Sequence, residues 1–167
     1  MKRKVLKKKS KTGFDINNPL VNAEDLKNHR GVGGVIHKGN KILIFYHKKY
    51  NFWTLPIGKV DLSKDPAIGF AQEMEEELGI EVLSYRLLGT FYKTYRRAPY
   101  VYTDIVSMIY NVISYNGIVR NKEPNKHPIM QWMTITEIRN IPKCKKSDAL
   151  KFYIKLREIM NDKCNIL

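Results

Sequence analysis

Three glutamates spaced for one face of a helix are the most chemically informative residues of this chain. Glu73, Glu76 and Glu77 stand at positions i, i+3 and i+4, which places their carboxylates on the same side of a helix. Two such charges about 4 Å apart repel by roughly 1 kcal/mol in water. A divalent cation between them reverses that sign, and clustered carboxylate oxygens suit Mg²⁺ or Mn²⁺. The spacing predicts a metal site here, and a merely solvated acidic face is the alternative.

The flanking residues predict the helix that must carry these carboxylates. Asp65 followed by Pro66 is typical of a helix start, with Asp as the N-cap and Pro at the first helical position. Gly79 is typical of a helix end. An apolar stripe with steps of four, three and four is expected on the opposite side. Its residues are Ala67, Ala71, Met74 and Leu78.

The segment from Gly58 to Ile80 resembles the Nudix box, G-x5-E-x7-R-E-U-x-E-E-x-G-U, where U is a bulky aliphatic residue. Seven of the nine defined positions match in register over 23 residues. The wider resemblance to the Nudix hydrolase family runs from about residue 31 to about residue 141. It implies a hydrolase of phosphorus-containing anhydrides that uses Mg²⁺ or Mn²⁺, held by Glu73, Glu76 and Glu77.

The chain departs from the box at two positions. Lys64 replaces the first Glu, which supports the metal site in the family, and Gln72 replaces the Arg, which braces the helix glutamates. A Lys64 side chain near Glu73 or Glu77 would partly replace that bracing charge. Alternatively, a Lys64 ammonium that occupied the position of the metal ion would weaken or abolish activity. The residues leave both alternatives open.

A second acidic segment lies outside the box. The stretch from Glu123 to His127, which reads Glu-Pro-Asn-Lys-His and precedes Trp132, resembles a loop of several nucleotide-hydrolysing Nudix branches. The resemblance implies that Glu123 acts as a base or as a further metal ligand. The proton acceptor for an attacking water is then Glu76, Glu77 or Glu123. His47 and His127 are expected to be structural or solvated rather than catalytic.

Five residues are candidates for substrate contacts. Gly58 lets the backbone approach phosphates, because it has no side chain to obstruct them. Lys59 and Lys64 offer point charges to the same phosphates. Tyr50 and Phe52 precede the box strand, and each is placed to stack on a base.

Composition and charge bound the remaining possibilities. The 167 residues suffice for one domain, expected at residues 29–167, and no apolar run reaches the roughly 18 residues typical of a membrane span. The chain carries a net charge of +14, and seven basic residues lie within residues 2–11. Residues 1–28 are therefore expected to form a basic, flexible segment that solubilises the chain or attracts RNA. Cys144 and Cys164 are expected to be free thiols of a cytoplasmic protein, and the basic segment resembles a nuclear-import signal if the host is eukaryotic.

Periodicity and turn residues predict the remaining elements. Strands are expected at residues 31–37, 41–47, 53–56, 81–95, 100–114 and 129–133, with a loop at 115–128. The first two strands are joined by a turn at residues 38–40. A short helix at 134–140 begins with a capping box of Thr134 and Glu137, and a last helix at 147–161 is capped by Ser147. This order implies an α/β fold with a mixed sheet covered on both faces. The Nudix resemblance implies the same α/β/α sandwich.

Three functions are consistent with these residues. The first is a metal-dependent pyrophosphohydrolase that cleaves a nucleoside di- or triphosphate derivative, favoured by the loop at Glu123. The second is an RNA 5′-end pyrophosphohydrolase or decapping enzyme, favoured by the basic segment. The third is a non-catalytic Nudix-fold module that binds RNA or protein.

Overall fold

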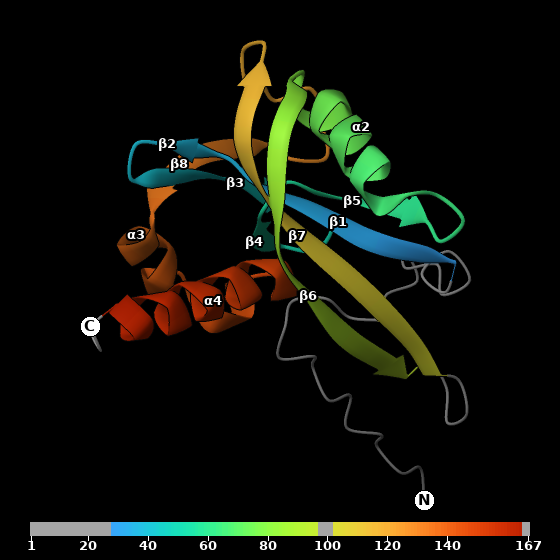
Figure 1. The fold of residues 1–167 in the computed structure, drawn as a ribbon. Coiled ribbons are helices and arrows are strands. Elements are labelled where there is room, and N and C mark those ends of the chain that lie inside the picture. The colour runs from blue at the N-terminus through green and yellow to red at the C-terminus, as the bar shows by residue number, and fades with distance from the viewer. Residues whose placement is uncertain (1–27, 97–101, 165–167) are drawn as a thin grey trace, which may run out of the picture.

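The computed structural model describes residues 28–96 and 102–164 and shows two β-sheets with helices on opposite sides (Figure 1). The strands are β1 (His29–Val35), β2 (His37–Lys38), β3 (Lys41–His47), β4 (Phe52–Thr54), β5 (Ile57–Asp61), β6 (Glu81–Arg96), β7 (Tyr102–Asn116) and β8 (Ile129–Thr134). The helices are α2 (Pro66–Leu78), α3 (Ile135–Asn140) and α4 (Asp148–Cys164), with a 3₁₀ turn at Lys143–Lys145. The basic segment predicted at residues 1–28 lies, except for residue 28, outside the described part of the chain.

The first sheet is mixed, as predicted. Its strand order is β5-β1-β7-β6, with β1 and β7 parallel and the other pairs antiparallel. The second sheet is antiparallel and contains β2, β3 and β4, with β8 paired to β3. Figure 1 shows α2 on one side of these sheets and α4 on the other. The α/β fold class is therefore confirmed, and the mixed sheet is accompanied by a second sheet.

The hairpin predicted for residues 31–37 and 41–47 is wrong in its first strand. The chain changes sheets at Ile36, so β1 pairs with β5 and β7 while only His37 and Lys38 pair with β3. Val35 and Ile36 are both fully buried, in the clusters on the α4 side and the α2 side respectively. Successive strand residues point to opposite faces. Where the chain changes sheets, Val35 and Ile36 are therefore buried on opposite sides, each in its own cluster.

Helix α2 begins and ends where the sequence predicts. The Asp65 carboxylate accepts the backbone N–H groups of Ala67 and Ile68, and Pro66 is the first helical residue. Gly79 ends the helix in the left-handed region with φ of 69°, which favours glycine. Met74 and Leu78 are fully buried as expected, whereas Ala67 and Ala71 of the predicted stripe are only half-buried, and Phe70 packs in the core instead.

Strand β5 is absent from the prediction, which places no strand between residues 56 and 81. The segment pairs antiparallel with β1 from His29↔Asp61 to Gly33↔Ile57. This pairing brings the lead-in of the box against the first turns of α2. The helix that carries the glutamates is thus packed on the strand that carries Gly58 and Lys59.

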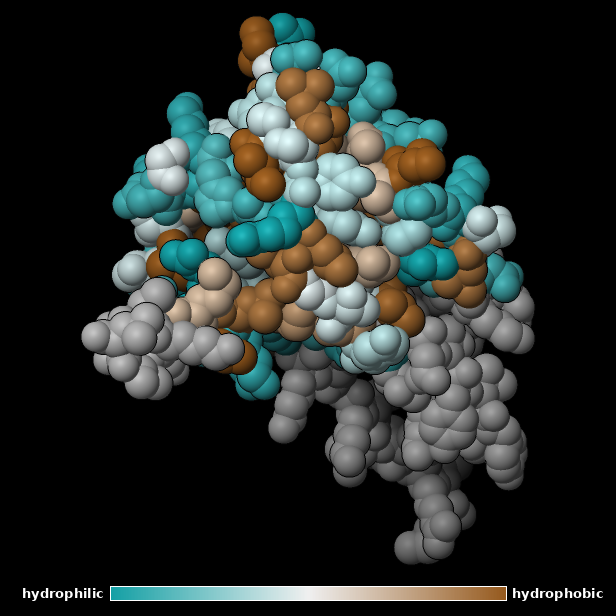
Figure 2. Space-filling model, in the orientation of Figure 1, coloured by the Kyte–Doolittle hydropathy of each residue, from teal (hydrophilic) through white to brown (hydrophobic). Residues whose placement is uncertain are grey.

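The longest strands, β6 and β7, form an antiparallel pair whose register shifts at Ser84 and Gly89. Strand β6 lies at the edge of the first sheet and exposes Leu83, Tyr85 and Leu87. Figure 2 shows the resulting mixture of apolar and polar side chains across this face.

The C-terminal elements follow the prediction closely. Thr134 and Glu137 form the expected capping box of α3. The Ser147 hydroxyl accepts the Leu150 N–H at 3.2 Å and donates to the Thr54 hydroxyl at 2.9 Å. The start of α4 is thereby tied to β4, so α4 begins at the edge of the pocket described below.

Two further predictions concern the cysteines and membrane-spanning segments. Cys144 is an exposed free thiol, whereas the Cys164 side chain lies outside the described residues. Within residues 28–96 and 102–164, none of the helices has the length and apolar composition needed to cross a membrane.

Candidate active site

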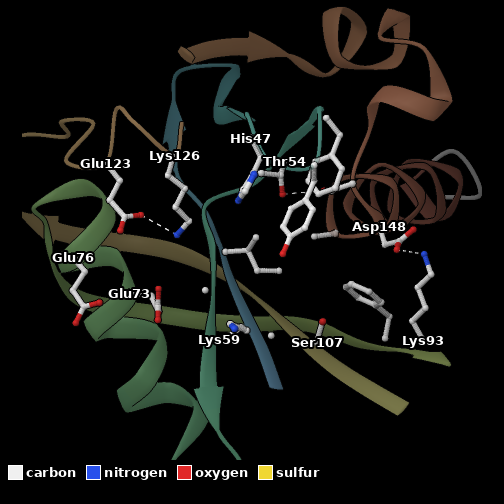
Figure 3. Close-up of a pocket in the computed structure, with 18 residues that line it drawn as sticks. His47, Thr54, Lys59, Glu73, Glu76, Lys93, Ser107, Glu123, Lys126 and Asp148 are labelled. Atoms are coloured by element: carbon white, nitrogen blue, oxygen red, sulfur yellow. Dashed lines mark hydrogen bonds and ion pairs between the residues drawn. The ribbon is translucent and has the colours of Figure 1, made fainter. Parts of the chain in front are cut away.

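An elongated pocket of about 410 Å³ lies between α2, the β3–β4 sheet and the start of α4. Figure 3 shows that its two ends differ in chemistry: Glu73, Glu76, Glu123 and Lys126 lie at one end, and Lys93 and Asp148 lie at the other. The lining between the ends is mostly aromatic and aliphatic. It includes Tyr50, Phe52, Ile57 and Phe91.

The acidic end is built by α2. Glu76 is exposed at the mouth, Glu73 is partly buried, and Glu77 is only 1% exposed. Burial raises the pKa of Glu77 to about 7, although the nearby Lys126 ammonium opposes that shift. Burial, together with the neighbouring Glu76 carboxylate, also raises the pKa of Glu73. Both shifts come mainly from burial, and a nearby cation would oppose them.

The loop between β7 and β8 brings a lysine and a fourth carboxylate to α2. The Lys126 ammonium donates to Glu77 Oε1 at 3.0 Å and to Glu123 Oε2 at 2.9 Å. The loop is folded back on itself, because the Lys126 and His127 N–H groups both donate to the Glu123 carbonyl. Although burial opposes it, the pairing with Glu77 and Glu123 raises the pKa of Lys126. Lys126 therefore stays charged and bridges the two acids.

Gly58 makes room for Glu73. A β-carbon at position 58 would lie 1.8 Å from Glu73 Oε2, well inside contact distance. The absence of a side chain thus admits the Glu73 carboxylate against the backbone of β5. This role is more specific than the predicted access for phosphates, although Gly58 also lines the pocket.

Two buried histidines stand beside the acidic end. His47 stacks on Tyr50 and is edge-on to His127, which itself stacks on Phe45. Burial and the Lys126 charge lower the pKa of His47 to about 4 and that of His127 to about 3. Both rings are therefore neutral at neutral pH, and the Nδ1 atom of each is buried without a hydrogen-bond partner.

The other end of the pocket carries a charged pair that the sequence analysis did not anticipate. Lys93 of β6 forms an ion pair with Asp148, the first residue of α4. The two residues are 55 positions apart, so no local pattern points to their contact. Thr54, Ser107 and Ser147 add hydroxyl groups to the lining nearby.

The two departures from the box lie in a neighbouring hollow of about 330 Å³. Lys64 and Gln72 line it together with Lys59, Glu73 and Glu76. Lys64 therefore brings its charge to the outer side of Glu73, whereas the cation in contact with Glu77 is Lys126. The bracing charge, for which Lys64 was one candidate, is supplied to Glu77 by Lys126 of the loop.

Most of the predicted site residues meet in one place. Those that line the pocket are Tyr50, Phe52, Gly58, Lys59, Glu73, Glu76 and Glu123. Glu77 lies behind it, in contact with Lys126, and Lys64 lines the neighbouring hollow. The contribution of Lys126 was missed, although its place in the Glu-Pro-Asn-Lys-His stretch was a signal that could have revealed it.

The donor set fits a hard divalent cation. One buried oxygen, Glu77 Oε2, has no hydrogen-bond partner, and ligand atoms of Glu77, Glu123 and His127 lie within 4.8 Å of one another. Carboxylate oxygens that are clustered, partly buried and short of positive charge are ligands that Mg²⁺ and Mn²⁺ accept.

Comparison with known proteins decides the family. The sequence model of the NUDIX domain matches residues 27–156. The chain belongs to the Nudix hydrolase family. Nudix hydrolases act on nucleotide-derived substrates and generally use divalent metals, which agrees with the acidic end of the pocket.

Individual Nudix proteins resemble the chain at modest identity. A MutT-like protein from Streptomyces ambofaciens is 26% identical over 106 residues, which cover 64% of this chain and 63% of that protein, less than two thirds of its length. An 8-oxo-dGTP diphosphatase from Buchnera aphidicola subsp. Schizaphis graminum is 24% identical over 110 residues, covering 64% of this chain and 77% of the relative. The crystal structure of a MutT NUDIX hydrolase from Burkholderia pseudomallei is 25% identical, with a TM-score of 0.62 and coverage of 77% and 96%.

Proposed function

We propose that this Nudix hydrolase is a metal-dependent pyrophosphohydrolase that cleaves a phosphoanhydride bond of a small nucleotide. The observation that carries the proposal is a single pocket with acids and a lysine at one end and a charged pair at the other (Figure 3). A volume of about 410 Å³ lies in the range of small-molecule sites.

At the acidic end, Glu73, Glu76 and Glu77 would hold the divalent ion. When bound, the ion neutralises phosphate oxygens and lowers the pKa of a coordinated water. Lys59 and Lys126 offer ammonium groups to the remaining phosphate charge, and Lys64 does so from the outer hollow. Together these groups bind and orient a chain of phosphates.

Three carboxylates are the candidates for taking the proton of the attacking water. Glu76 is exposed at the mouth, and Glu123 lines the pocket beside Lys126. Glu77, whose pKa burial raises to about 7, is the third candidate when it does not hold the ion. Unlike Glu76 and Glu123, it is buried and does not line the pocket.

Away from the acidic end, the pocket suits a nucleobase. In the stretch between the two ends, Tyr50 and Phe52 form a stacked aromatic wall, with ring centroids 5.5 Å apart. The Asp148 carboxylate accepts hydrogen bonds and the Lys93 ammonium donates them, side by side. A base edge with N–H groups next to a carbonyl, as in guanine, matches this pair. The resemblance to an 8-oxo-dGTP diphosphatase supports the same class of base.

RNA 5′ ends are the second candidate substrate. The observation in their favour is the net charge of +14, with seven basic residues within residues 2–11. In this alternative, residues 1–28 attract the RNA and the single domain proposed at residues 29–167 cleaves its terminal phosphates.

A substrate panel scored by mass spectrometry of the products tests the proposal. Purified protein with Mg²⁺ is incubated with nucleoside triphosphates, oxidised purine triphosphates and a triphosphorylated RNA. We expect release of phosphate or pyrophosphate from a small nucleotide, faster than from the RNA.

The matched variants are Glu76→Gln and Glu75→Gln. Both lie on α2, but only Glu76 lines the pocket. We expect Glu76→Gln to lose at least about 100-fold in turnover and Glu75→Gln to change by less than about threefold. Equal turnover by Glu76→Gln and the wild type, or no turnover on any substrate, would defeat the catalytic assignment and leave a binding module.

A further inference from the structure

Three possible ligands from α2 and the loop before β8 converge behind the mouth of the pocket. They are Glu77, Glu123 and His127, and one ligand atom from each lies within 4.8 Å of the other two. His127 Nδ1 lies 4.0 Å from Glu123 Oε2. Unlike the Glu73 and Glu76 carboxylates, this group contains a nitrogen.

Two of these three residues are buried and lack a hydrogen-bond partner at the atom in question. Glu77 is 1% exposed and His127 is 2% exposed, yet Glu77 Oε2 and His127 Nδ1 make no hydrogen bond. Buried polar atoms are rarely left without a partner, and a bound ion is one recognised explanation when they are. The pairing of a buried oxygen with a buried nitrogen points to a cation rather than to an anion.

We propose that Glu77, Glu123 and His127 form an inner divalent-metal site with mixed oxygen and nitrogen ligands that prefers Mn²⁺ to Mg²⁺. The inference deepens the proposed function, on which it rests for the presence of a divalent ion at this end of the pocket. Imidazole nitrogen is a poor ligand for Mg²⁺, which favours oxygen and water, and a better one for transition metals.

The distances are compatible with one shared ion. Two ligands bound at about 2.1 Å from a metal lie at most about 4.2 Å apart. The 4.0 Å between His127 Nδ1 and Glu123 Oε2 falls within that limit. One ligand atom from each of the three residues lies within 4.8 Å of the other two, and the Glu123 side chain, 38% exposed, has room to adjust.

Its neighbours hold the His127 side chain in one orientation more firmly than they hold Glu123. The His127 ring stacks on Phe45 with centroids 4.5 Å apart. Its backbone N–H donates to the Glu123 carbonyl at 2.8 Å, and its carbonyl accepts from the Asn121 amide at 2.6 Å. A ring that stacks on Phe45 and is carried by a hydrogen-bonded backbone presents its nitrogen in a constant direction, which favours metal binding.

The Lys126 ammonium lies where the proposed site would bind its metal ion. The ammonium lies 3.0 Å from Glu77 and 2.9 Å from Glu123, between the two acids. A divalent ion carries twice that charge, and the Lys126 side chain, 40% exposed on a flexible stem, can move into the adjoining pocket. There the displaced ammonium would face the phosphates of a substrate.

Pulsed electron paramagnetic resonance of bound Mn²⁺ tests the inference directly. The full-length protein is loaded with Mn²⁺ alone, without nucleotide. We expect modulation from a directly bound ¹⁴N nucleus, replaced by the ¹⁵N pattern when the protein is labelled with ¹⁵N-histidine. Bound Mn²⁺ with no nitrogen coupling overturns the proposal, and this measurement needs no variant.

His127→Gln and His47→Gln form the matched pair of variants. Both histidines are buried beside the pocket with an unpartnered Nδ1, but His47 stands outside the three-residue group. We expect His127→Gln to lose the nitrogen signal and about tenfold in Mn²⁺ affinity, with less than about threefold loss for Mg²⁺. We expect His47→Gln to keep the nitrogen signal. A signal that disappears only in His47→Gln contradicts the assignment.

The outcome is separable from that of the proposed function. Turnover that depends on Glu76, together with Mn²⁺ that shows no nitrogen ligand, removes this inference and keeps the hydrolase. A nitrogen-bound Mn²⁺ in a protein without turnover on any substrate keeps the metal site and removes the hydrolase.

Discussion

At the scale of single residues, the burial of His47 makes the free energy of unfolding depend on pH. Its pKa falls from 6.5 to about 4, mainly because burial disfavours the charged ring. Between these two values the unfolded chain binds a proton that the folded chain does not. The contribution of His47 to stability is therefore complete above pH 6.5 and is lost as the pH falls to about 4.

Replacing His47 by Gln should remove this dependence. We compare the free energies of unfolding of wild type and His47→Gln in the presence of a metal chelator. The difference between them should shrink by roughly 1 kcal/mol per pH unit as the pH falls from 6.5 to 4. Urea unfolding followed by fluorescence across that range measures the difference. Because both proteins keep Glu73 and Glu77, whose raised pKa values act in the opposite direction, the comparison isolates the histidine. Two parallel profiles would show that His47 titrates normally.

Asp148 should determine which base is accepted. Asp148→Asn removes the carboxylate charge beside Lys93 and leaves the acidic end unchanged. We expect kcat/KM for guanine nucleotides to fall at least about tenfold relative to adenine nucleotides. The control is Glu158→Gln, which removes an exposed acid of α4 that pairs with Arg139 outside the pocket. An unchanged ratio between the two bases in Asp148→Asn would argue against base recognition at this end.

At the scale of elements, the contact between β5 and α2 sets the position of Glu73. Gly58→Ala places a carbon 1.8 Å from the Glu73 carboxylate in the present geometry, so the side chain must move. A displacement of about 1 Å can cost as much as 100-fold in rate, and we expect a loss of at least about tenfold in kcat. Circular dichroism should show an unchanged helix content.

A double-mutant cycle separates this effect from general damage to β5. If Gly58→Ala acts through Glu73, then adding it to Glu73→Gln should cost little more than Glu73→Gln alone. Fully multiplicative losses would mean that position 58 acts independently of Glu73.

Elements specified by local signals were predictable, and those specified by distant pairing were not. Helix α2 follows from Asp65, Pro66 and Gly79, each of which acts within one turn of the helix end. Strand β5 and the change of sheet at Ile36 depend on pairing between β1, β5 and β7. A short run containing Gly58 and Lys59 shows little periodicity of its own, so its partner in the sheet decides its structure.

The same division applies to the site. The side-by-side carboxylates of Glu73, Glu76 and Glu77 follow from the period of the helix. The contact of Lys126 with Glu77 spans 49 residues, and its presence depends on how the loop folds back over α2. The ion pair of Lys93 with Asp148 depends on where β6 and α4 meet, which periodicity does not reveal.

At the scale of the whole molecule, the distribution of charge distinguishes the two substrate classes. Residues 1–12 contain seven basic residues and so contribute much of the net charge. The residues that line the pocket all lie further along the chain. We expect deletion of residues 1–12 to change kcat/KM for a small nucleotide by less than about twofold at moderate salt. It should weaken RNA binding by tenfold or more, with a smaller dependence on salt.

Kinetics and filter binding of the two proteins at several salt concentrations check this expectation. A loss of more than about tenfold on the small nucleotide would favour a polyanionic substrate such as an RNA 5′ end.

The fold holds acids from α2 and the loop before β8 at one end of a pocket, where the proposed function places the phosphates of a nucleotide. Calorimetric titration of the full-length protein with Mg²⁺, in the presence of a non-hydrolysable nucleotide, tests that arrangement most directly. We expect saturable uptake in the wild type and in Glu75→Gln, and a loss of affinity of at least about tenfold in Glu76→Gln. No uptake by the folded wild type, or equal uptake by Glu76→Gln, would contradict the account.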